Sequence, residues 1–224
     1  MSGRSKKIIC MVAYSEYQLD MRIKAEAEAL AEENEVHLLI LRYGNLTRPV
    51  KKGALTFFPL KVSRFRSVKK FGYLISYFWF FLKVFFKINY LDFKYRYDVL
   101  YFHTMPDFIV WAGIIQKLKG CKLILDIHDL FPEMFLIKFK KRPESIFYRW
   151  LVFLERKSAN FAHQVICVSE PHKQVLSHKG IKQPKVIMNI PSDSIFQPGH
   201  RKKSFQYKLV FHGTITQRAG CDLI

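Results

Sequence analysis

Uninterrupted hydrophobic runs alternate along the chain with stretches in which hydrophobic residues recur every three or four positions. The uninterrupted runs predict strands that are buried on both faces, and the spaced pattern predicts amphipathic helices. In residues 20–33, for example, Ile23, Ala27 and Leu30 share one helix face. The predicted strands are 7–14, 35–41, 54–62, 98–103, 122–127, 164–169 and 185–190, and the predicted helices are 20–33, 107–119, 144–162 and 170–179.

The alternation of strands and helices predicts a Rossmann-like α/β fold, a doubly wound parallel sheet with helices on both faces, over residues 1–190. Residues 191–205 have the proline, glycine and basic content of a linker. Residues 206–224 begin with a further strand-like run and are expected to open an incomplete second α/β domain. A strand that joins the edge of the first sheet is the alternative for this last segment.

The composition is that of a folded domain with reduced cysteines. Half of the 224 residues are hydrophobic, which is enough to bury a core. The four cysteines are far apart and form no C-x-x-C pair, so we expect reduced thiols packed as small hydrophobic residues: Cys10, Cys121, Cys167 and Cys221. The N-terminus has no signal-peptide pattern, and both features lead us to expect a cytoplasmic location.

The chain is strongly basic, with 37 Lys and Arg against 18 Asp and Glu and a formal net charge of +19. Such a surface favours phosphate-bearing partners, which are nucleic acid, anionic lipid headgroups or phosphorylated substrates. Basic and aromatic residues are densest in residues 43–98, around the hydrophobic run 71–82. This run is shorter than the roughly 20 residues that a membrane span needs.

The run therefore predicts either a core helix of the domain or a helix that lies in a membrane interface, and we favour the second. Aromatic side chains beside many lysines are typical of interfacial helices. The residues expected to contact an anionic membrane are Lys69, Lys70, Tyr77, Trp79, Phe80, Lys83 and Lys87.

Several common catalytic and cofactor motifs are absent. The sequence has no G-x-G-x-x-G after its first strand, no G-x-x-x-x-G-K-[ST], no H-E-x-x-H, no G-x-S-x-G and no set of residues with zinc-ligand spacing. Candidate chemistry lies instead where the predicted strands end, the edge at which open α/β sheets bind ligands. His103 ends one strand, and Asp126, His128, Asp129 and Glu133 lie at the end of the next.

A histidine beside an aspartate can be held in one tautomer and used to contact or deprotonate a hydroxyl group, which makes His128 the candidate catalytic residue. The alternative is structural: His128 would form hydrogen bonds at a helix start, with Asp129 as the helix cap. Near the C-terminus, Gly213, Arg218 and Gly220 combine close backbone approach with a cation suited to phosphate.

The succession of motifs along the chain resembles one known family. In chain order the motifs are D-x-R-x-x-x-E-A-x-x-L (20–30), Y-D-V-L-Y-F-H (97–103), L-D-I-H-D-L-F-P-E (125–133), V-I-C-V-S-E (165–170), K-V-I-M-N-I-P-S-D-S-I-F-Q-P (185–198) and L-V-F-H-G-T-I-T-Q-R-A-G-C-D (209–222). Together they resemble the family 4 glycosyltransferases, which are retaining enzymes of the GT-B fold.

The resemblance implies two Rossmann-like domains facing each other across a cleft, the first binding the acceptor and the second a nucleotide-sugar. It implies that His128 lies at the cleft floor and that Gly213, Arg218 and Gly220 bind the donor diphosphate. The family's E-x7-E segment would lie beyond residue 224. No metal is implied, and no cofactor beside the nucleotide-sugar substrate. The residues expected around the acceptor cleft are Tyr14, Ser15, Asp20, Arg22, His103, Asp126, Asp129, Glu133, Ser169, Glu170 and Asn189.

We therefore expect the N-terminal part of a cytoplasmic glycosyltransferase, peripheral at the inner face of the membrane and serving polysaccharide biosynthesis. It would transfer a hexose to a lipid-linked or lipid-borne glycan and be inactive alone. The first alternative is a non-catalytic or split-subunit acceptor-binding module whose donor domain is a separate chain. A nucleic-acid-binding protein is disfavoured, because the aromatic residues lie in one hydrophobic run and no RNA- or DNA-binding module is present.

Overall fold

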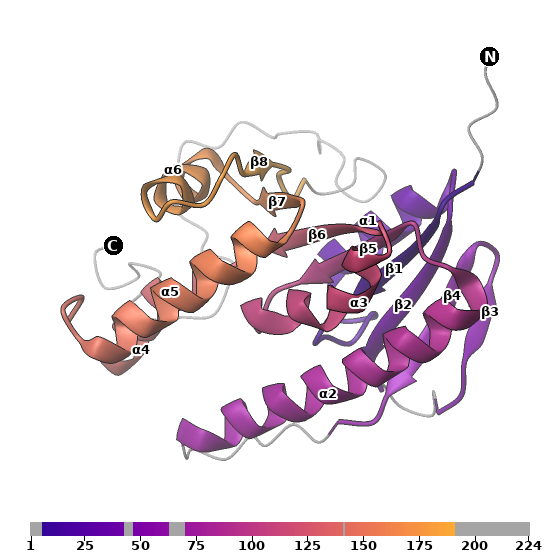
Figure 1. Ribbon diagram of the computed structural model, residues 1–224, viewed down its shortest axis with the longest axis horizontal. Coiled ribbons are helices and arrows are strands. Elements are labelled where there is room, and N and C mark those ends of the chain that lie inside the picture. Colours follow the sequence, from indigo (N-terminus) through magenta and orange to yellow (C-terminus); the bar gives the residue numbers. More distant parts are fainter. Residues whose placement is uncertain (1–5, 43–46, 63–69, 141, 191–224) are drawn as a thin grey trace, which may run out of the picture.

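One eight-stranded sheet organises the residues that the computed structural model describes, which are 6–42, 47–62, 70–140 and 142–190 (Figure 1). The strand order is β3-β4-β2-β1-β5-β6-β7-β8. The strands are β1 (Ile8–Val12), β2 (Glu35–Leu41), β3 (Val50–Lys52), β4 (Leu55–Leu60), β5 (Val99–His103), β6 (Lys122–Ile127), β7 (Gln164–Cys167) and β8 (Lys185–Val186). The predicted Rossmann-like α/β fold is confirmed.

The edge strand β3 departs from the parallel arrangement of the other described strands. It runs antiparallel to β4, whereas every other neighbouring pair is parallel. The two strands are joined at Gly53, whose φ of +60° lies in the left-handed region that glycine adopts without a Cβ clash. The sequence does not predict β3, because a valine followed by two lysines has no strand-like hydrophobic pattern.

Helices connect most of the successive strands. They are α1 (Met21–Ala31), α2 (Lys70–Tyr95), the 3₁₀-helix η1 (Asp107–Gly113), α3 (Ile114–Leu118), α4 (Phe131–Phe139), α5 (Ile146–Phe161) and α6 (Glu170–His178). The predicted helices 20–33, 144–162 and 170–179 correspond to α1, α5 and α6, and the segment 107–119 is divided between η1 and α3. The sequence pattern indicates a turn where α4 forms, but Pro132 lies in the first turn of α4, where its missing N–H costs no hydrogen bond.

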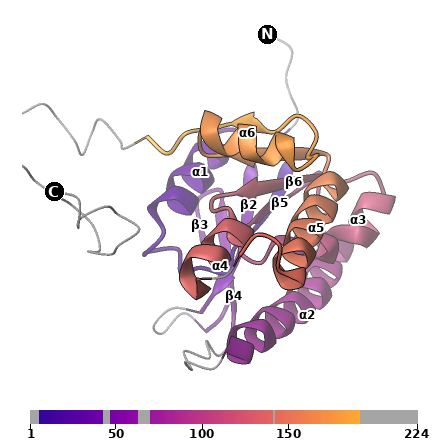
Figure 2. The same cartoon turned by 90° about the vertical axis from the view of Figure 1, so that its left-hand side faces the viewer.

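Each face of the sheet has its own hydrophobic core, because successive strand residues point to opposite faces. On one face, Ile9 and Met11 of β1 pack with Ile23 of α1. On the other face, Val12 belongs to a cluster that includes Phe80 of α2 and residues of η1 and α5. Figure 2 shows α1 on one side of the strands and α2, α3 and α5 on the other. The result is a three-layer α/β/α domain.

The cysteines of the described segments are reduced, as the sequence predicts. Cys10, Cys121 and Cys167 are free and buried. Burial raises the pKa of the Cys121 thiol to about 12, so this thiol keeps its proton near neutral pH. The three buried cysteines therefore act as small core residues. Cys221 lies outside the described residues.

Three segments of the sequence analysis lie wholly or partly outside the described residues. The predicted linker 191–205 and the predicted second domain 206–224 stay predictions, as does the part of the basic segment that falls in 43–46 and 63–69. Among the helices that are described, none has the length and hydropathy needed to cross a membrane.

Candidate active site

A cluster of ionisable side chains lies where β5 and β6 end. The two strands pair in parallel, and their register sets His103 beside Asp126. Alternation along each strand then points Tyr101, His103, Asp126 and His128 to the face that α1 covers. Glu26 of α1 approaches from that side, with its Oε2 3.8 Å from Nδ1 of His103.

Asp126 is the centre of this cluster. Its Oδ2 lies 3.0 Å from Nε2 of His128, accepts a hydrogen bond of 3.1 Å from the Tyr101 hydroxyl, and lies 3.6 Å from Nδ1 of His103. The two imidazoles are themselves 3.2 Å apart, between Nε2 of His128 and Nδ1 of His103. Asp126 and His103 are each 2% exposed and His128 is 6% exposed, so the network is shielded from water.

The protonation states follow from this packing. Burial alone would raise the pKa of Asp126, but the hydrogen bond and positive charge of His128 hold it below its ordinary value. Burial lowers the pKa of His103 to about 4, so this ring is neutral near pH 7. Burial and the Asp126 charge raise the pKa of Tyr101, which therefore keeps the proton that it donates. An ionised Asp126 accepts the Nε2 proton of His128, and in neutral His128 the lone pair is then on Nδ1.

The protonation of Glu26 depends on this cluster. Burial, and then the negative charge of Asp126, raise its pKa to about 7. Among the described residues, three buried atoms of the cluster have no hydrogen-bond partner: Oε2 of Glu26, Nε2 of His103 and Oδ1 of Asp126. Buried polar atoms are nearly always paired, so these three mark a place with capacity for a bound group.

The start of α1 brings two further predicted residues towards the cluster. Asp20 is the N-cap of α1, and its Oδ1 accepts a hydrogen bond from the backbone N–H of Ile23. Arg22 lies 3.4 Å from the same oxygen. Burial would raise the pKa of Asp20, but the charge and hydrogen bond of Arg22 lower it, with a smaller contribution from His128. The Asp20 carboxylate is therefore within electrostatic reach of the His128 cluster.

His103, Asp126 and His128 could together hold a metal ion. Their ligand atoms all lie within 4.8 Å of one another, and imidazole and carboxylate are ligands of Zn²⁺. The same atoms are already joined by the hydrogen bonds described above, which explains their closeness without an ion. That no metal takes part stays a prediction.

Glu133 lies in a different cluster from His128. Its Oε1 accepts a hydrogen bond from the Tyr148 hydroxyl at 3.0 Å, and its Oε2 lies 2.7 Å from Nζ of Lys179. Lys179 also contacts Glu155, whose side chain is 0% exposed. The Glu133 carboxylate therefore links α4 to α5 and to the end of α6. Glu133 lies in the first turn of α4, not in a loop at the cleft.

The structural alternative for His128 predicted Asp129 as the N-cap of the following helix, and this part of it is wrong. The N-cap of α4 is Leu130, not Asp129, and it makes no side-chain capping bond. Asp129 is partly exposed next to His128, and the backbone N–H of His128 donates to Oγ1 of Thr104. His128 is thus fixed by β6 and by the loop after β5.

The remaining predicted cleft residues lie at strand ends but outside the Asp126 network. Tyr14 packs its ring on Tyr77 of α2, with ring centroids 5.2 Å apart, on the opposite face of the sheet. The backbone carbonyl of Ser15 accepts a bond from Leu41. Ser169 is the N-cap of α6. Glu170 pairs with Lys173 on the surface, and Asn189 is exposed after β8.

Two residues of the network were not predicted as site residues, Glu26 and Tyr101. Both are present in the quoted motifs. Tyr101 precedes His103 by two residues and so shares its face of β5, a signal that strand alternation alone provides. Glu26 becomes recognisable only once α1 is known to carry its side chain to the end of β5. The donor-phosphate candidates Gly213, Arg218 and Gly220 lie outside the described residues.

The residues predicted to contact the membrane lie on different sides of helix α2, some buried and some exposed. Phe80 is 0% exposed in the core between α2 and the sheet, so its assignment as a membrane contact is wrong. Trp79 beside it is 53% exposed, and Tyr77 is partly buried. Lys83 is exposed and donates to the carbonyl of Lys61, and the ammonium of Lys87 lies 5.5 Å from the Phe58 ring centroid. Lys69 lies outside the described residues; Lys70 begins α2, and nothing is described of its side chain.

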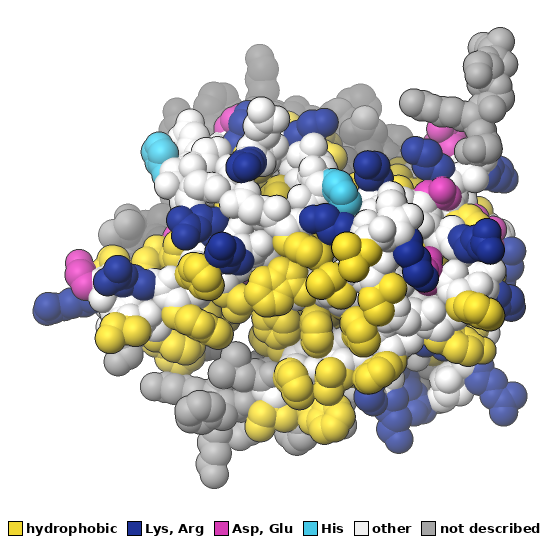
Figure 3. Space-filling model, viewed as in Figure 1, with side chains coloured by type: hydrophobic (Ala, Val, Ile, Leu, Met, Phe, Trp, Pro, Cys, Tyr) yellow, Lys and Arg dark blue, Asp and Glu magenta, His cyan; other side chains and the backbone are white. Residues whose placement is uncertain are grey.

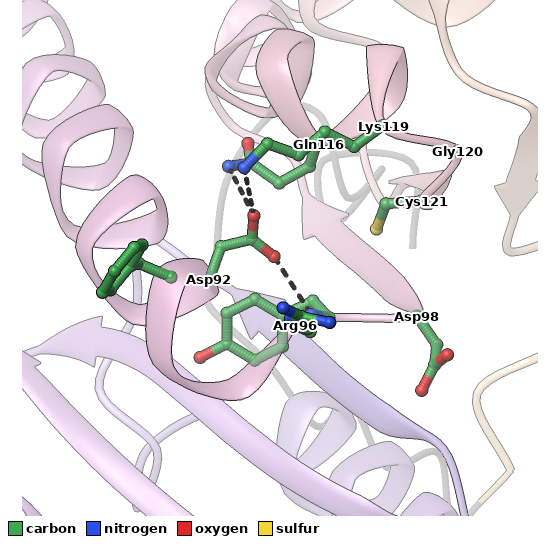
Figure 4. Close-up of a pocket in the computed structure, with 9 residues that line it drawn as sticks. Asp92, Arg96, Asp98, Gln116, Lys119, Gly120 and Cys121 are labelled. Atoms are coloured by element: carbon green, nitrogen blue, oxygen red, sulfur yellow. Dashed lines mark hydrogen bonds and ion pairs between the residues drawn. The ribbon is translucent and has the colours of Figure 1, made fainter.

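A hollow of about 640 Å³ lies at the opposite edge of the sheet, where β5 and β6 begin (Figure 4). At its wall, Asp92 of α2 accepts hydrogen bonds from Nζ of Lys119 at 3.0 Å and from the backbone N–H of Tyr97 at 3.0 Å. Gln116 adds a longer contact of 3.4 Å. These bonds tie α2 to α3 and to β5, which accounts for the polar groups here. The hollow is far along the strands from His128 and is not part of the candidate site.

Solved structures with a similar fold are glycosyltransferases. Sucrose-phosphate synthase from Thermosynechococcus elongatus matches with a TM-score of 0.62 and 12% identity, over 87% of this chain and 51% of that one. A UDP-glucosyltransferase from Polygonum tinctorium capable of glucosylating indoxyl gives 0.53 and 12%, over 88% and 55%. Os79 from O. sativa in complex with UDP gives 0.51 and 9%, over 88% and 55%. The chain thus spans about half the length of these structures, which have the GT-B fold.

Sequence comparison identifies the family. No curated protein matches the chain significantly. The family model described as Glycosyltransferase Family 4 matches residues 21–189, which is well over half of the chain. The match includes Glu26, Tyr101, His103, Asp126 and His128, the whole hydrogen-bonded cluster at the end of β5 and β6. The chain therefore belongs to glycosyltransferase family 4.

Proposed function

We propose that this chain is the acceptor-binding half of a retaining glycosyltransferase, which transfers a hexose from a nucleotide-sugar to a lipid-linked or lipid-borne glycan. The observation that carries the proposal is the buried His128–Asp126 pair at the carboxyl edge of a parallel sheet. In open α/β sheets this edge is where ligands bind, and the chain belongs to a family of glycosyltransferases.

In this proposal, Asp126 orients His128 and the imidazole contacts the transferred sugar. An ionised carboxylate that accepts the Nε2 proton leaves Nδ1 as the acceptor for a hydroxyl proton. Tyr101 keeps Asp126 in place by donating to the same oxygen. The nucleotide-sugar enters as a substrate, and the proposal requires neither a metal ion nor a further cofactor.

The donor domain completes the cleft in this proposal. Gly213, Arg218 and Gly220 would contact the diphosphate, and an E-x7-E segment beyond residue 224 would hold the donor sugar. That the chain spans about half of the matching solved structures supports a two-domain enzyme. The alternative is a split enzyme. In it, this chain is a non-catalytic acceptor-binding subunit, and the donor domain is a separate chain.

We further propose a cytoplasmic enzyme, peripheral at the inner face of the membrane and active in polysaccharide biosynthesis. A net charge of +19 and the basic, aromatic helix α2 support attraction to an anionic surface. A nucleic-acid partner is not part of the proposal, since the aromatic residues of α2 lie along one helix rather than across a sheet face.

Transfer of labelled hexose to lipid tests the proposal. The 224-residue chain is incubated with a panel of radiolabelled nucleotide-hexoses and a lipid extract of the source cells, with and without a donor domain that contains an E-x7-E segment. We expect label in the lipid phase only with the donor domain present, because both halves must position their substrates. Turnover by the 224-residue chain alone would contradict the half-enzyme claim, and no transfer from any nucleotide-hexose in the complete enzyme would contradict the transferase claim.

The source of the donor domain separates the single enzyme from the split enzyme. An in-frame or frameshifted E-x7-E segment in the DNA after codon 224 supports one two-domain polypeptide. A separate gene for a donor domain, whose product binds this chain and restores transfer, supports the split-subunit alternative.

A further inference from the structure

Helix α2 is hydrophobic on two opposite sides. On its inner side, Phe80 and Ile88 are 0% exposed and pack against the sheet. On its outer side, Phe86, Tyr90 and Phe93 recur at helical spacing and are 67%, 70% and 91% exposed. The inner side packs in the core of the domain, so the outer apolar side needs a second apolar environment.

The neighbouring helices extend the outer side of α2 into one surface. Figure 3 shows hydrophobic side chains gathered on a single face over α2, α3 and α5. Large contiguous hydrophobic patches are rare on free monomers and mark sites of interaction. We call this surface the three-helix face; the exposed hydrophobic residues of its helices are Ile75, Phe78, Trp79, Phe86, Tyr90, Phe93, Ile114, Ile115, Leu118, Ile146, Phe147, Trp150 and Phe153.

The exposed charges on these helices have one sign. α2 and α5 contain one acidic residue each, Asp92 and Glu155, and these are 6% and 0% exposed, while α3 contains none. The basic residues lie on the outside or at its margin. On α2 their spacing of four and seven keeps them on one flank of the apolar stripe. The exposed basic residues are Lys83 and Lys94 of α2 and Arg149, Arg156 and Lys157 of α5, while Lys87 of α2 and Lys117 of α3 are half-buried.

We propose that the three-helix face lies on an anionic membrane, with its aromatic and aliphatic side chains inserted at headgroup depth and its Lys and Arg side chains bound to lipid phosphates. A second copy of the chain is a poorer partner, because two faces with only positive exposed charge would repel each other. The 26 residues of α2 are about 39 Å long, which suits a helix lying in the plane of the bilayer.

The three-helix face adjoins the segments that follow the two strands of the candidate active site. Tyr77 of α2 and Trp150 of α5 line a cavity of about 40 Å³ together with Pro106 and Phe131. Pro106 and Phe131 belong to the segments that directly follow β5 and β6, the strands that carry the Asp126 network. A docked chain would therefore hold its active-site edge near the membrane. This inference rests on the proposed function for one point, the lipid-borne acceptor that such a chain would meet.

Vesicle binding tests the proposal without any sugar chemistry. The chain is co-sedimented with phosphatidylcholine vesicles and with phosphatidylcholine vesicles containing phosphatidylglycerol, neither of which carries a glycan. We expect binding to the anionic vesicles that weakens but persists at high salt, because insertion adds to charge attraction. Replacing charge by K94E/R149E/K157E should weaken binding by at least about tenfold, since each basic residue near an anionic surface adds about a factor of five.

Two apolar variants test whether α3 and α5 take part as well as α2. L118S/F153S and F86S/F93S should each weaken binding to anionic vesicles by about tenfold or more. The control L19S/M188S removes two exposed apolar residues outside the three-helix face, 68% and 62% exposed, and should bind like the unmodified chain. Circular dichroism confirms that each variant is folded.

Three results would overturn the proposal. The first is equal binding of L118S/F153S and the unmodified chain. The second is the complete loss of binding at high salt, which would assign the attraction to charge alone. The third is a dimer in sedimentation velocity that L118S/F153S dissociates, with no vesicle binding, which would assign the face to a second copy. A failure here leaves the transferase proposal standing, since the vesicles contain no acceptor.

Discussion

Asp126 sets the hydrogen-bonding state of the residues around it. One oxygen, Oδ2, lies within 3.1 Å of both the His128 ring and the Tyr101 hydroxyl, so the carboxylate is held ionised in a buried place. Its charge fixes the proton of His128 on Nε2 and favours the protonated form of Glu26. The network therefore presents one imidazole with a defined tautomer, which is what contact with a sugar hydroxyl requires.

The raised pKa of Glu26 makes stability depend on pH. Its folded value of about 7 exceeds the ordinary value of 4.5, so between these pH values the folded chain holds a proton that the unfolded chain has lost. The contribution of Glu26 to the free energy of unfolding should therefore fall as the pH rises through this window, opposite in sign to that of His103, whose pKa is lowered to about 4. In urea unfolding at a series of pH values, the free energy of unfolding of Glu26→Gln should lack this falling contribution and so change more in the upward direction with pH than that of the unmodified chain. Exposed Glu33→Gln is the control, and the same pH dependence in Glu26→Gln as in the unmodified chain would contradict the assignment.

At the scale of the elements, Lys179 joins three helices around a buried carboxylate. Its ammonium lies 2.5 Å from Oε2 of Glu155 and 2.7 Å from Oε2 of Glu133, on α5 and α4. Burial raises the pKa of Glu155, and the Lys179 charge partly offsets this effect. The side chain of Glu155 is 0% exposed, and within the described part of the chain Lys179 is the cation that forms an ion pair with it.

Loss of Lys179 should be strongly destabilising. Lys179→Met leaves Glu155 uncompensated in the interior, and breaking a buried pair in this way typically lowers the free energy of unfolding by about 3–5 kcal/mol. Lys173→Met is the matched control, because the Lys173–Glu170 pair on α6 is on the surface, where such pairs contribute about 1 kcal/mol or less. Equal urea midpoints for the two variants would show that the buried pair is not needed.

The strands could be predicted because parallel strands are hydrophobic on both faces. The strand β3 and the helix α4 could not, since neither has an alternating pattern of its own. Helix α2 was ambiguous for a different reason. It has apolar residues on both sides, so the sequence does not tell buried Phe80 from exposed Trp79. The Lys83 interaction with the carbonyl of Lys61 is also invisible in the sequence.

The candidate site was predictable as far as strand ends and neighbouring residues reveal it. His103, Asp126 and His128 follow from their places at the ends of β5 and β6. Glu26 joins them only through the packing of α1 over the sheet. Glu133 lies outside this cluster, because α4 directs its carboxylate towards Tyr148 and Lys179. Contacts between helices distant in sequence are set by packing, which no local pattern records.

At the scale of the whole molecule, one end of the sheet carries the candidate site and one helical face carries the exposed apolar surface. The Asp126 network lies at the carboxyl ends of β5 and β6, and the three-helix face begins beside the segments that follow these strands. In the proposed function, this sheet edge is the side on which a second domain would close. The central claim is that His128 acts on the sugar at this edge.

Replacement of His128 tests that claim most directly. His128 is 6% exposed, so His128→Ala should also destabilise the fold by about 1–3 kcal/mol through the hydrogen bond lost to Asp126. His128→Gln is therefore the sharper variant, because its amide N–H can still donate to Asp126 while the ring nitrogen is lost. In the enzyme completed with its donor domain, we predict a kcat for hexose transfer that is about 10²-fold lower or more in His128→Gln, with an unchanged Tm. A folded His128→Gln enzyme with the kcat of the unmodified protein would contradict the account.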